Sequence, residues 1–215
     1  MDIYEALYTT RAMRRLKPDP IPMDVQARIL DAAIRAPNIG QQWHFVVVDD
    51  RHIMSRLAPL YETAFERLLG SYGTSMEDLL RAEGDAARAA RSGIHLARTF
   101  EHVPLLLVAF GKHRDGSGVY PAVWSAMLAA RAEGIGSTLT GVLQSYFRDE
   151  LFEILGVPDE GWHCHGVVPM GYPAGRWGVA PRLPVQAVAA RNGWSGDLGF
   201  SVDQPLWPAA DLRTA

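Results

Sequence analysis

The stretch that decides the fold class is residues 22–48, which read PMDVQARILDAAIRAPNIGQQWHFVVV. In its first half, apolar side chains recur at helical spacing, from a proline near the start to Pro37 just after the end. Its last four residues, 45–48, form a short apolar run that is typical of a buried strand. A helix followed directly by a buried strand indicates that helices and strands are mixed along one chain.

Helices and strands also alternate in the rest of the chain. Residues 53–99 are expected to be mostly helical with a break near residues 70–73, and residues 121–133 form another expected helix. Short apolar runs predict strands over 105–110 and 166–170, and residues 137–140 form another expected short strand. No repeat or low-complexity linker interrupts the chain. We therefore expect an α+β layered fold, with one domain over residues 1–195 and a C-terminal tail over residues 196–215.

Bulk composition excludes several classes of protein. The chain has 215 residues, 48% hydrophobic and 21% charged, which is typical of a globular domain and not of a disordered chain. Its net charge of −3 offers no general attraction for nucleic acid or for an anionic membrane. The one cysteine, Cys164, cannot form an internal disulfide, and the start resembles no signal peptide. These features favour a cytoplasmic protein with no nucleic-acid or membrane partner.

Three arginines stand close together near the N-terminus. Residues 9–16 read TTRAMRRL, directly after a short amphipathic segment over residues 3–8. A guanidinium group is a rigid fork of donors that suits phosphate oxygens, so Arg11, Arg14 and Arg15 could converge on one anion. The alternative is a solvated basic face that pairs with nearby carboxylates.

The C-terminal segment after Tyr172 has a different character. It is broken by prolines and carries Trp177, Trp194 and Trp207. Such a segment cannot build its own core, yet three tryptophans in water would be costly. We expect it to wrap over its own domain or over a partner subunit, as in homodimers that exchange extended arms.

Several patterns that suggest chemistry are weak. His163 and His165 would face one side of a strand and Cys164 the other, which favours packing or hydrogen bonding over a metal site. Gly134 and Gly136 follow a helix and precede a strand, the reverse of the dinucleotide-binding order. The nucleophile elbow of hydrolases and the phosphate loop of ATPases are both missing. We expect no metal ion and no catalytic dyad.

Four segments, in the right order, resemble the nitroreductase family of FMN-dependent oxidoreductases. Residues 11–16 are similar to its Arg-Ser-x-Arg-x-Phe opening, and residues 36–48 to its Ala-Pro…Trp-x-Phe strand entry. Residues 128–138 resemble its Leu-Ala-Ala-x-Ala-x-Gly-Leu-Gly signature, and residues 170–184 its Gly-Tyr-Pro and Pro-Arg elements. The resemblance implies a three-layer α/β/α sandwich with a central mixed, mainly antiparallel sheet and an extended C-terminal arm.

The resemblance also implies a set of residues that bind FMN. The residues expected at the phosphate and ribityl end are Arg11, Ala12, Arg14, Arg15 and, from the C-terminal side, Arg182. The residues expected to reach the flavin from the partner subunit are Pro37, Asn38, Ile39 and Gln41. The residues expected along the isoalloxazine ring, with a backbone donor for flavin N5 or O4, are Leu139, Thr140 and Gly141. Two departures are plain: Ala12 replaces the usual serine, and the turn over 36–43 is about two residues shorter than the common pattern.

The implied activity is the NAD(P)H-dependent reduction of nitroaromatics, quinones or similar small acceptors, with ping-pong kinetics and two shared FMN sites in a homodimer. Because hydride transfer belongs to the flavin, no protein acid or base is required. The acceptor site is expected to be broad and mostly apolar. A flavin dehydrogenase or dehalogenase of the same superfamily, a flavin-sequestering protein, and a flavin-free interaction module are the alternatives.

Overall fold

The computed structural model describes residues 1–207, apart from the side chains of residues 85 and 86. The last eight residues of the tail expected over 196–215 therefore lie outside the described part. The chain forms two compact units, one over residues 12–175 and one made of residues 1–11 with the chain from Arg176 onward. Each unit is described by itself.

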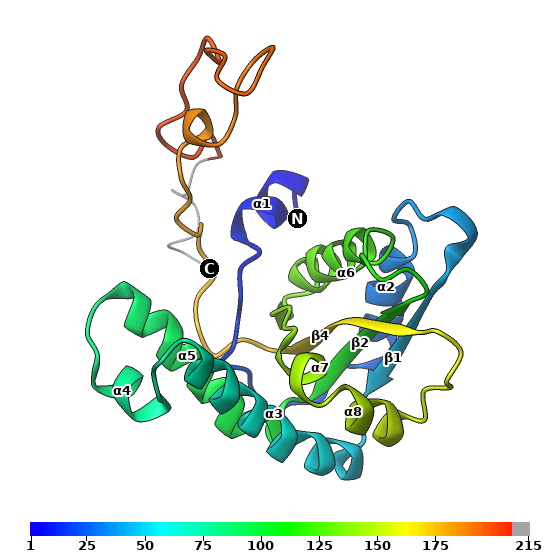
Figure 1. Ribbon diagram of the computed structural model, residues 1–215. Helices are drawn as coiled ribbons and strands as arrows, with labels where there is room; N and C mark the ends of the chain where they lie inside the picture. The colour runs from blue at the N-terminus through cyan, green and yellow to red at the C-terminus, as the bar shows by residue number, and fades with distance from the viewer. Residues whose placement is uncertain (208–215) are drawn as a thin grey trace. The chain divides into compact units, whose positions relative to one another are not determined.

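A four-stranded sheet forms the middle of the unit over residues 12–175 (Figure 1). Its strands are β1 (Trp43–Val48), β2 (Leu105–Gly111), β3 (Gly136–Ser137) and β4 (His163–Gly171). Their order is β1-β2-β4-β3, and each neighbouring pair is antiparallel. The expected mainly antiparallel character is confirmed, and an isolated parallel bridge joins Ala12, which lies outside the four strands, to Ser137.

Seven α-helices and two short 3₁₀ turns complete this unit. They are α2 (Met23–Ala33), η1 (Ile39–Gln41), α3 (Arg51–Ser71), α4 (Met76–Arg81), α5 (Asp85–Thr99), η2 (Phe100–His102), α6 (Tyr120–Ala132), α7 (Val142–Tyr146) and α8 (Arg148–Leu155). Local sequence signals fix the start of α3 and the end of α8. The carboxylate of Asp50 accepts a hydrogen bond from the N–H of Ile53 (2.9 Å) and caps α3, and Gly156 ends α8 with a left-handed φ of 64°.

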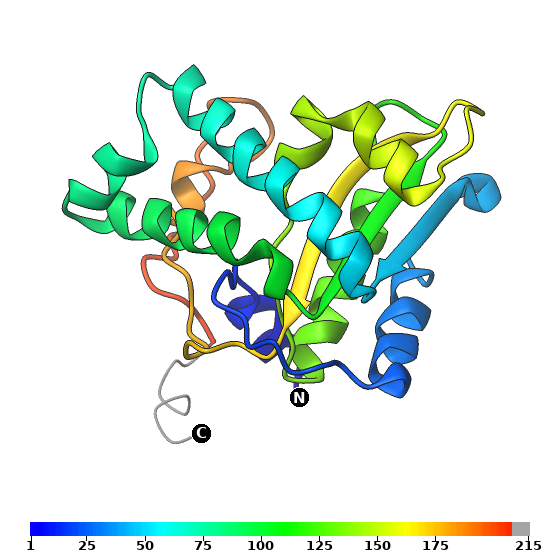
Figure 2. The same ribbon diagram turned by 90° about the horizontal axis from the view of Figure 1, so that it is seen from below.

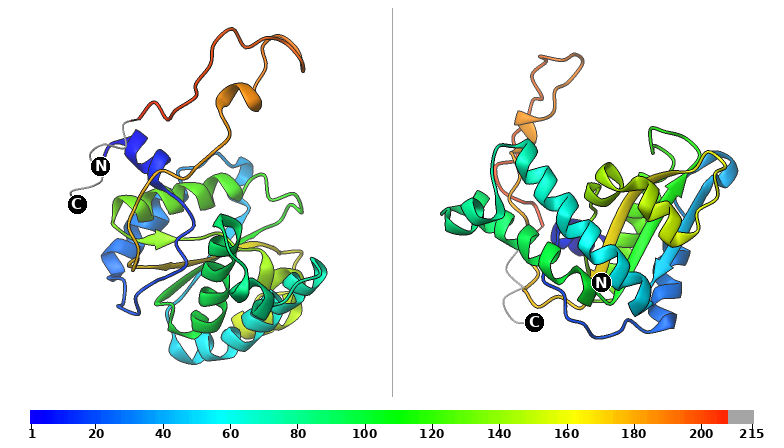
Figure 3. Two further views of the ribbon diagram at one scale, coloured as in Figure 1. Left: turned by 90° about the vertical axis from the view of Figure 1, so that its left-hand side faces the viewer. Right: turned by 60° about the horizontal axis from the view of Figure 1, so that its bottom comes forward.

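The helices cover both faces of the sheet, as Figures 2 and 3 show. All seven residues of β2 are buried, because alternate side chains enter two different cores. Leu107 packs in the core beneath α2 and α6, while Leu106 packs in the core beneath α3, α7 and α8. The expected three-layer α+β architecture is confirmed.

The bounds of β3 and β4 differ most from those expected, whereas β1 begins two residues earlier and β2 ends one residue later. The strand expected over 137–140 is only two residues long, because Thr138 and Leu139 leave the ladder and Thr140 rejoins β4 as an isolated bridge to Val167. In contrast, β4 begins three residues before the expected start at residue 166. Its register shifts beside His165, so the polar residues there enter the strand through a β-bulge.

The other unit contains one helix, α1 (Ile3–Thr9), and a C-terminal segment whose described part has only the short turn η3 (Val185–Ala187). The rings of Tyr8 and Trp207 lie 6.1 Å apart, whereas Trp194 is fully exposed. None of the helices among residues 1–207 combines the length and apolar character needed to cross a membrane.

Candidate functional site

The arginine-bearing segment lies between two glycine-containing stretches of the sheet. The N–H of Met13 donates to the carbonyl of Ser137 (2.9 Å), and the N–H of Lys17 donates to the carbonyl of Tyr172 (2.8 Å). A Cβ at Gly136 would lie 2.9 Å from the Cβ of Met13, which is closer than side chains approach. Only glycine therefore allows this backbone contact.

The same close approach recurs at the other glycine of the segment. A Cβ at Gly171 would lie 3.0 Å from the Cβ of Leu16. Gly136 and Gly171 belong to the two glycine motifs that the sequence analysis singled out. Their physical role is to let residues 12–17 lie against the sheet edge.

This backbone path determines which side chains face outward. Met13 enters the core and is 6% exposed, while Arg14 is half-buried and Arg15 is exposed. Among the described residues, neither arginine forms an ion pair with a carboxylate. The alternative of a basic face neutralised by local carboxylates therefore finds no support at Arg14 and Arg15.

His95 of α5 lies close enough to Arg15 for its pKa to respond to the charge of that arginine. Burial lowers the pKa of its imidazole, and the charge of Arg15 lowers this pKa further. An anion is thus the ligand that the surroundings of Arg14 and Arg15 favour. The sequence carried no signal for His95, because its place beside Arg15 depends on the packing of a helix eighty residues away.

Arg14 also lies near a buried phenol. Tyr61 of α3 is 3% exposed and stacks on Phe100 at 4.0 Å between ring centroids. Burial raises the pKa of Tyr61, while its hydrogen bond with Thr140 and the nearby charge of Arg14 act in the opposite direction. The structure therefore brings together Arg14 and Thr140, both expected at the flavin, through a tyrosine that sequence reasoning missed.

The segment expected along the flavin ring is held to β4 at one residue. Thr140 exchanges two backbone hydrogen bonds of 2.9 Å with Val167. Its hydroxyl oxygen accepts from the Tyr61 hydroxyl (3.4 Å) and from the N–H of Val142 (3.3 Å), so this hydroxyl anchors the start of α7. Within the described chain, the N–H groups of Leu139 and Gly141 donate to no acceptor. These two are the free backbone donors of the segment.

The turn over residues 36–43 is ordered by its asparagine. The amide nitrogen of Asn38 donates to the carbonyl of Gly118 (2.8 Å), and its oxygen accepts from the N–H of Gln42 (3.2 Å). Gly40 and Gln41 take left-handed φ values of 76° and 49°. Ile39 is 98% exposed, and Pro37 is also exposed. Asn38 thus holds the turn to the 112–120 loop, and its expected contact with a partner's flavin stays a prediction.

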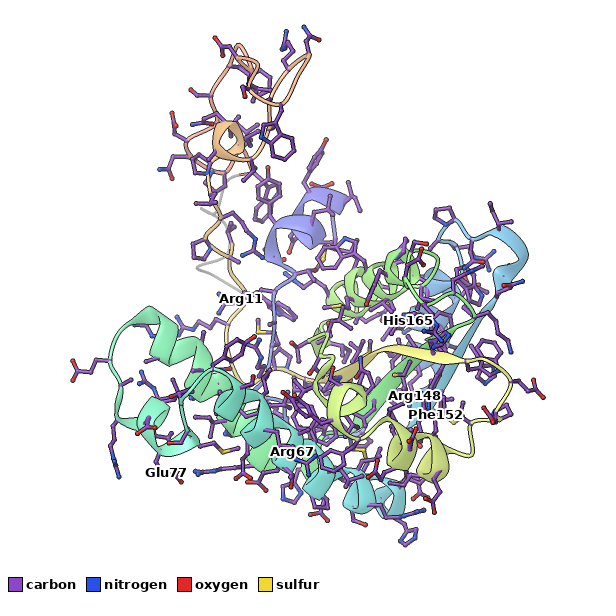
Figure 4. The ribbon with its side chains drawn as sticks, viewed as in Figure 1. Arg11, Arg67, Glu77, Arg148, Phe152 and His165 are labelled. Carbon is purple, nitrogen blue, oxygen red and sulfur yellow. The ribbon has the colours of Figure 1, made fainter. Side chains whose placement is uncertain are left out.

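Two expected phosphate ligands belong to the other unit. Arg11 and Arg182 are both exposed there; the guanidinium of Arg11 lies beside Gly178, and that of Arg182 donates to the carbonyl of Pro181 (2.9 Å). Figure 4 labels Arg11. Ala12 is exposed and offers no side-chain donor. Convergence of Arg11 and Arg182 with Arg14 stays a prediction.

Comparison with known proteins matches most of this chain. The model of the Nitroreductase family matches residues 7–172. A protein of Thermus thermophilus named NADH dehydrogenase is 27% identical over 202 residues, which cover 87% of this chain and 95% of the relative.

Solved structures share the fold at lower sequence identity. An oxidized iodotyrosine deiodinase bound to FMN and 3-iodo-L-tyrosine aligns with a TM-score of 0.67 and 21% identity, over 89% of this chain and 99% of that one. A nitroreductase with bound FMN from Desulfitobacterium hafniense aligns with a TM-score of 0.64 and 19% identity, over 88% and 98% of the two chains.

Proposed function

Because this chain belongs to the nitroreductase family, we propose that it is an FMN-dependent oxidoreductase that uses NAD(P)H to reduce nitroaromatics, quinones or similar small acceptors. The solved relatives named above carry FMN, and the Thermus relative is named for NADH. When bound, FMN supplies the hydride chemistry that no side chain provides.

The observation that carries this proposal is the set of arginines without carboxylate partners. In the described residues, the consecutive Arg14 and Arg15 have no acidic side chain paired to them, and the charge of Arg15 helps to lower the pKa of His95. A phosphate fits this donor set, since guanidinium groups bind its oxygens in pairs. In the proposed complex, Arg14 and Arg15 hold the phosphate, with Arg11 and Arg182 as further ligands.

The backbone over residues 139–141 fits the opposite end of the cofactor. Thr140 is fixed to β4, so the free N–H groups of Leu139 and Gly141 have a defined position. We assign these two N–H groups as donors to the edge of the isoalloxazine ring. A rigid donor tunes the electron affinity of a flavin without any proton transfer by the protein.

The proposed assembly is a homodimer that shares its two flavin sites. The exposed Ile39, in a turn ordered from within by Asn38, is a surface suited to a second copy of the chain. Pro37, Asn38, Ile39 and Gln41 would then approach the flavin bound by the partner.

Anaerobic stopped-flow mixing tests the proposed function. The purified yellow protein should lose its flavin absorbance when mixed with NADH or NADPH and regain it when a nitroaromatic or quinone is added. Steady-state rates should give parallel double-reciprocal lines, as for ping-pong turnover. If neither nucleotide bleaches the flavin within minutes, the reductase proposal is wrong. A flavin store, or a dehydrogenase reduced by an organic substrate, would then replace it.

A further inference from the structure

A polar pocket lies at the start of β4, and none of the residues that line it is among those expected at the flavin. It is an open pocket of about 470 Å³ and is lined by Arg114, Gln144, Arg148, His163, Cys164 and His165. This volume is within the range of small-molecule sites, roughly 300–1,000 Å³. Figure 4 shows His165 and Arg148 beside the first part of β4.

Two buried side-chain atoms of residues that line this pocket have no hydrogen-bond partner among the described residues. They are the Nε2 atom of His165 and the Oε1 atom of Gln144. His165 is only 7% exposed, so its ring cannot turn to solvent. Buried polar atoms are almost always hydrogen-bonded, and two orphaned acceptors in one pocket therefore indicate a missing donor.

A β-bulge in β4 determines the position of His165. His165 is the extra residue of the β-bulge, because Ala109 pairs with Gly166 while Phe110 pairs with Cys164. Bulges re-aim a side chain and are frequent next to functional sites. A Cβ at Gly116 would lie 2.7 Å from the Nδ1 atom of His165, so this glycine makes room for the ring.

The hydrogen bonding of the imidazole makes its Nε2 atom an acceptor. The ring hydrogen-bonds to the backbone of His113, and this bond favours a proton on the ring nitrogen that makes it. Burial lowers the pKa of His165, which keeps the ring neutral at pH 7. A neutral ring with one bonded N–H has a lone pair on its other nitrogen, Nε2.

The charge of the lining defines a second feature of the ligand. Arg114 and Arg148 line the pocket, and none of the described residues that line it is acidic. Arg148 lies over the ring of Phe152 (4.0 Å) and pairs with the exposed Asp149 (2.7 Å). Two guanidinium groups in the lining favour an anion, whereas the two buried acceptors require hydrogen-bond donors.

We propose that this pocket binds a small organic carboxylate that also carries a hydroxyl or N–H donor. The carboxylate lies against Arg114 and Arg148, and the donor reaches His165 and Gln144. The inference does not depend on the flavin or on the proposed reductase activity, since it concerns binding alone.

The test is calorimetric titration of the full-length protein, as purified with its flavin, against four matched probes. 4-Hydroxybenzoate and 4-aminobenzoate carry both features, 4-methoxybenzoate lacks the donor, and 4-hydroxybenzyl alcohol lacks the anion. The first two should bind with a Kd below about 1 mM, and the other two about tenfold more weakly or worse. Failure of both complete probes to bind, or equal binding of the methoxy compound, would overturn the proposal and leave water as the partner of the two acceptors.

Matched variants assign the effect to the pocket. His165→Phe and Gln144→Leu should each lower the affinity for 4-hydroxybenzoate by about tenfold and leave that for 4-methoxybenzoate unchanged. Arg148→Gln should weaken both carboxylates. His44→Phe, the same substitution in the separate pocket beside Trp162, should change neither. If His165→Phe does not fold, Gln144→Leu decides alone, and unchanged binding in that variant contradicts the assignment.

Discussion

The guanidinium of Arg14 is half-buried, lies near Tyr61 and has no carboxylate partner among the described residues. If it binds the FMN phosphate, Arg14→Ala removes a charge-assisted contact of about 1.5–3 kcal/mol. The affinity of the apoprotein for FMN should then fall about 10- to 100-fold, which fluorescence titration measures. Arg35→Ala is the matched control, because Arg35 pairs with Asp31 on the exposed surface of α2. Equal losses in the two variants would mean that only net charge matters.

His95 offers a spectroscopic check on the same site. In the flavin-free protein, burial and then the charge of Arg15 lower the pKa of His95. A phosphate bound at Arg15 would favour the charged imidazole, so adding FMN should raise this pKa. Because the pKa rises on binding, the linked contribution of His95 to FMN affinity should grow as the pH falls through the imidazole range.

NMR titration of the imidazole signals, with and without FMN, measures this shift. The variant His95→Gln identifies the resonance among the seven histidines. An unchanged or lowered pKa of His95 would place the phosphate away from Arg15.

At the scale of elements, the site depends on the contact between residues 12–17 and the strand edge. In Gly136→Ala, the added Cβ meets the Cβ atoms of Met13 (2.9 Å) and Pro173 (3.3 Å), neither of which is a flexible chain end. We expect the free energy of unfolding to fall by about 1–3 kcal/mol, with weaker FMN binding because Arg14 shifts. Gly70→Ala, in helix α3 with open space around it, should instead stabilise the protein by about 0.5–1 kcal/mol. Urea unfolding compares them, and similar effects at both sites would contradict the close-contact argument.

Elements with a strong local pattern could be predicted from the sequence, whereas contacts made by packing could not. The buried run of β2 and the break between α3 and α4 follow from apolar spacing and from glycines, and both are confirmed. The bulge at His165 breaks the period of two, so β4 begins earlier than its apolar residues indicated.

The residues of the candidate sites also fall into two groups, those with a sequence motif and those that only packing brings to the site. Arg14 and Thr140 carried motif signals, but Tyr61 and His95 reach them from helices whose packing no local pattern encodes. The polar pocket is harder still to predict from the sequence, because Arg114, Gln144 and Arg148 come from a loop and two helices. The sequence pattern favoured packing or hydrogen bonding at His165, but it did not indicate that one ring nitrogen has no partner among the described residues.

At the scale of the whole molecule, the C-terminal segment leaves large apolar side chains uncovered within its own unit. Trp194 is 100% exposed, Leu206 76% and Leu183 71%. Leaving such surface in water is unfavourable by about 25 cal/mol per Å², so in the proposed homodimer we expect a second copy of the chain to cover it. Residues 12–175, in contrast, contain both cores of the three-layer fold.

Truncation after Gly175 separates these two parts. This cut keeps Pro173 and Ala174, which pair with the arginine segment at Leu16 and Arg15, and removes Arg182 with the exposed apolar segment. We expect a folded monomer by sedimentation velocity and circular dichroism, with FMN affinity reduced about tenfold or more through loss of the Arg182 contact and of the partner's turn. Full-length Trp194→Ala controls for loss of one aromatic side chain without loss of the arm, and should weaken the dimer less. A truncated chain that still forms a stable dimer with undiminished FMN affinity would show that neither the arm nor Arg182 takes part.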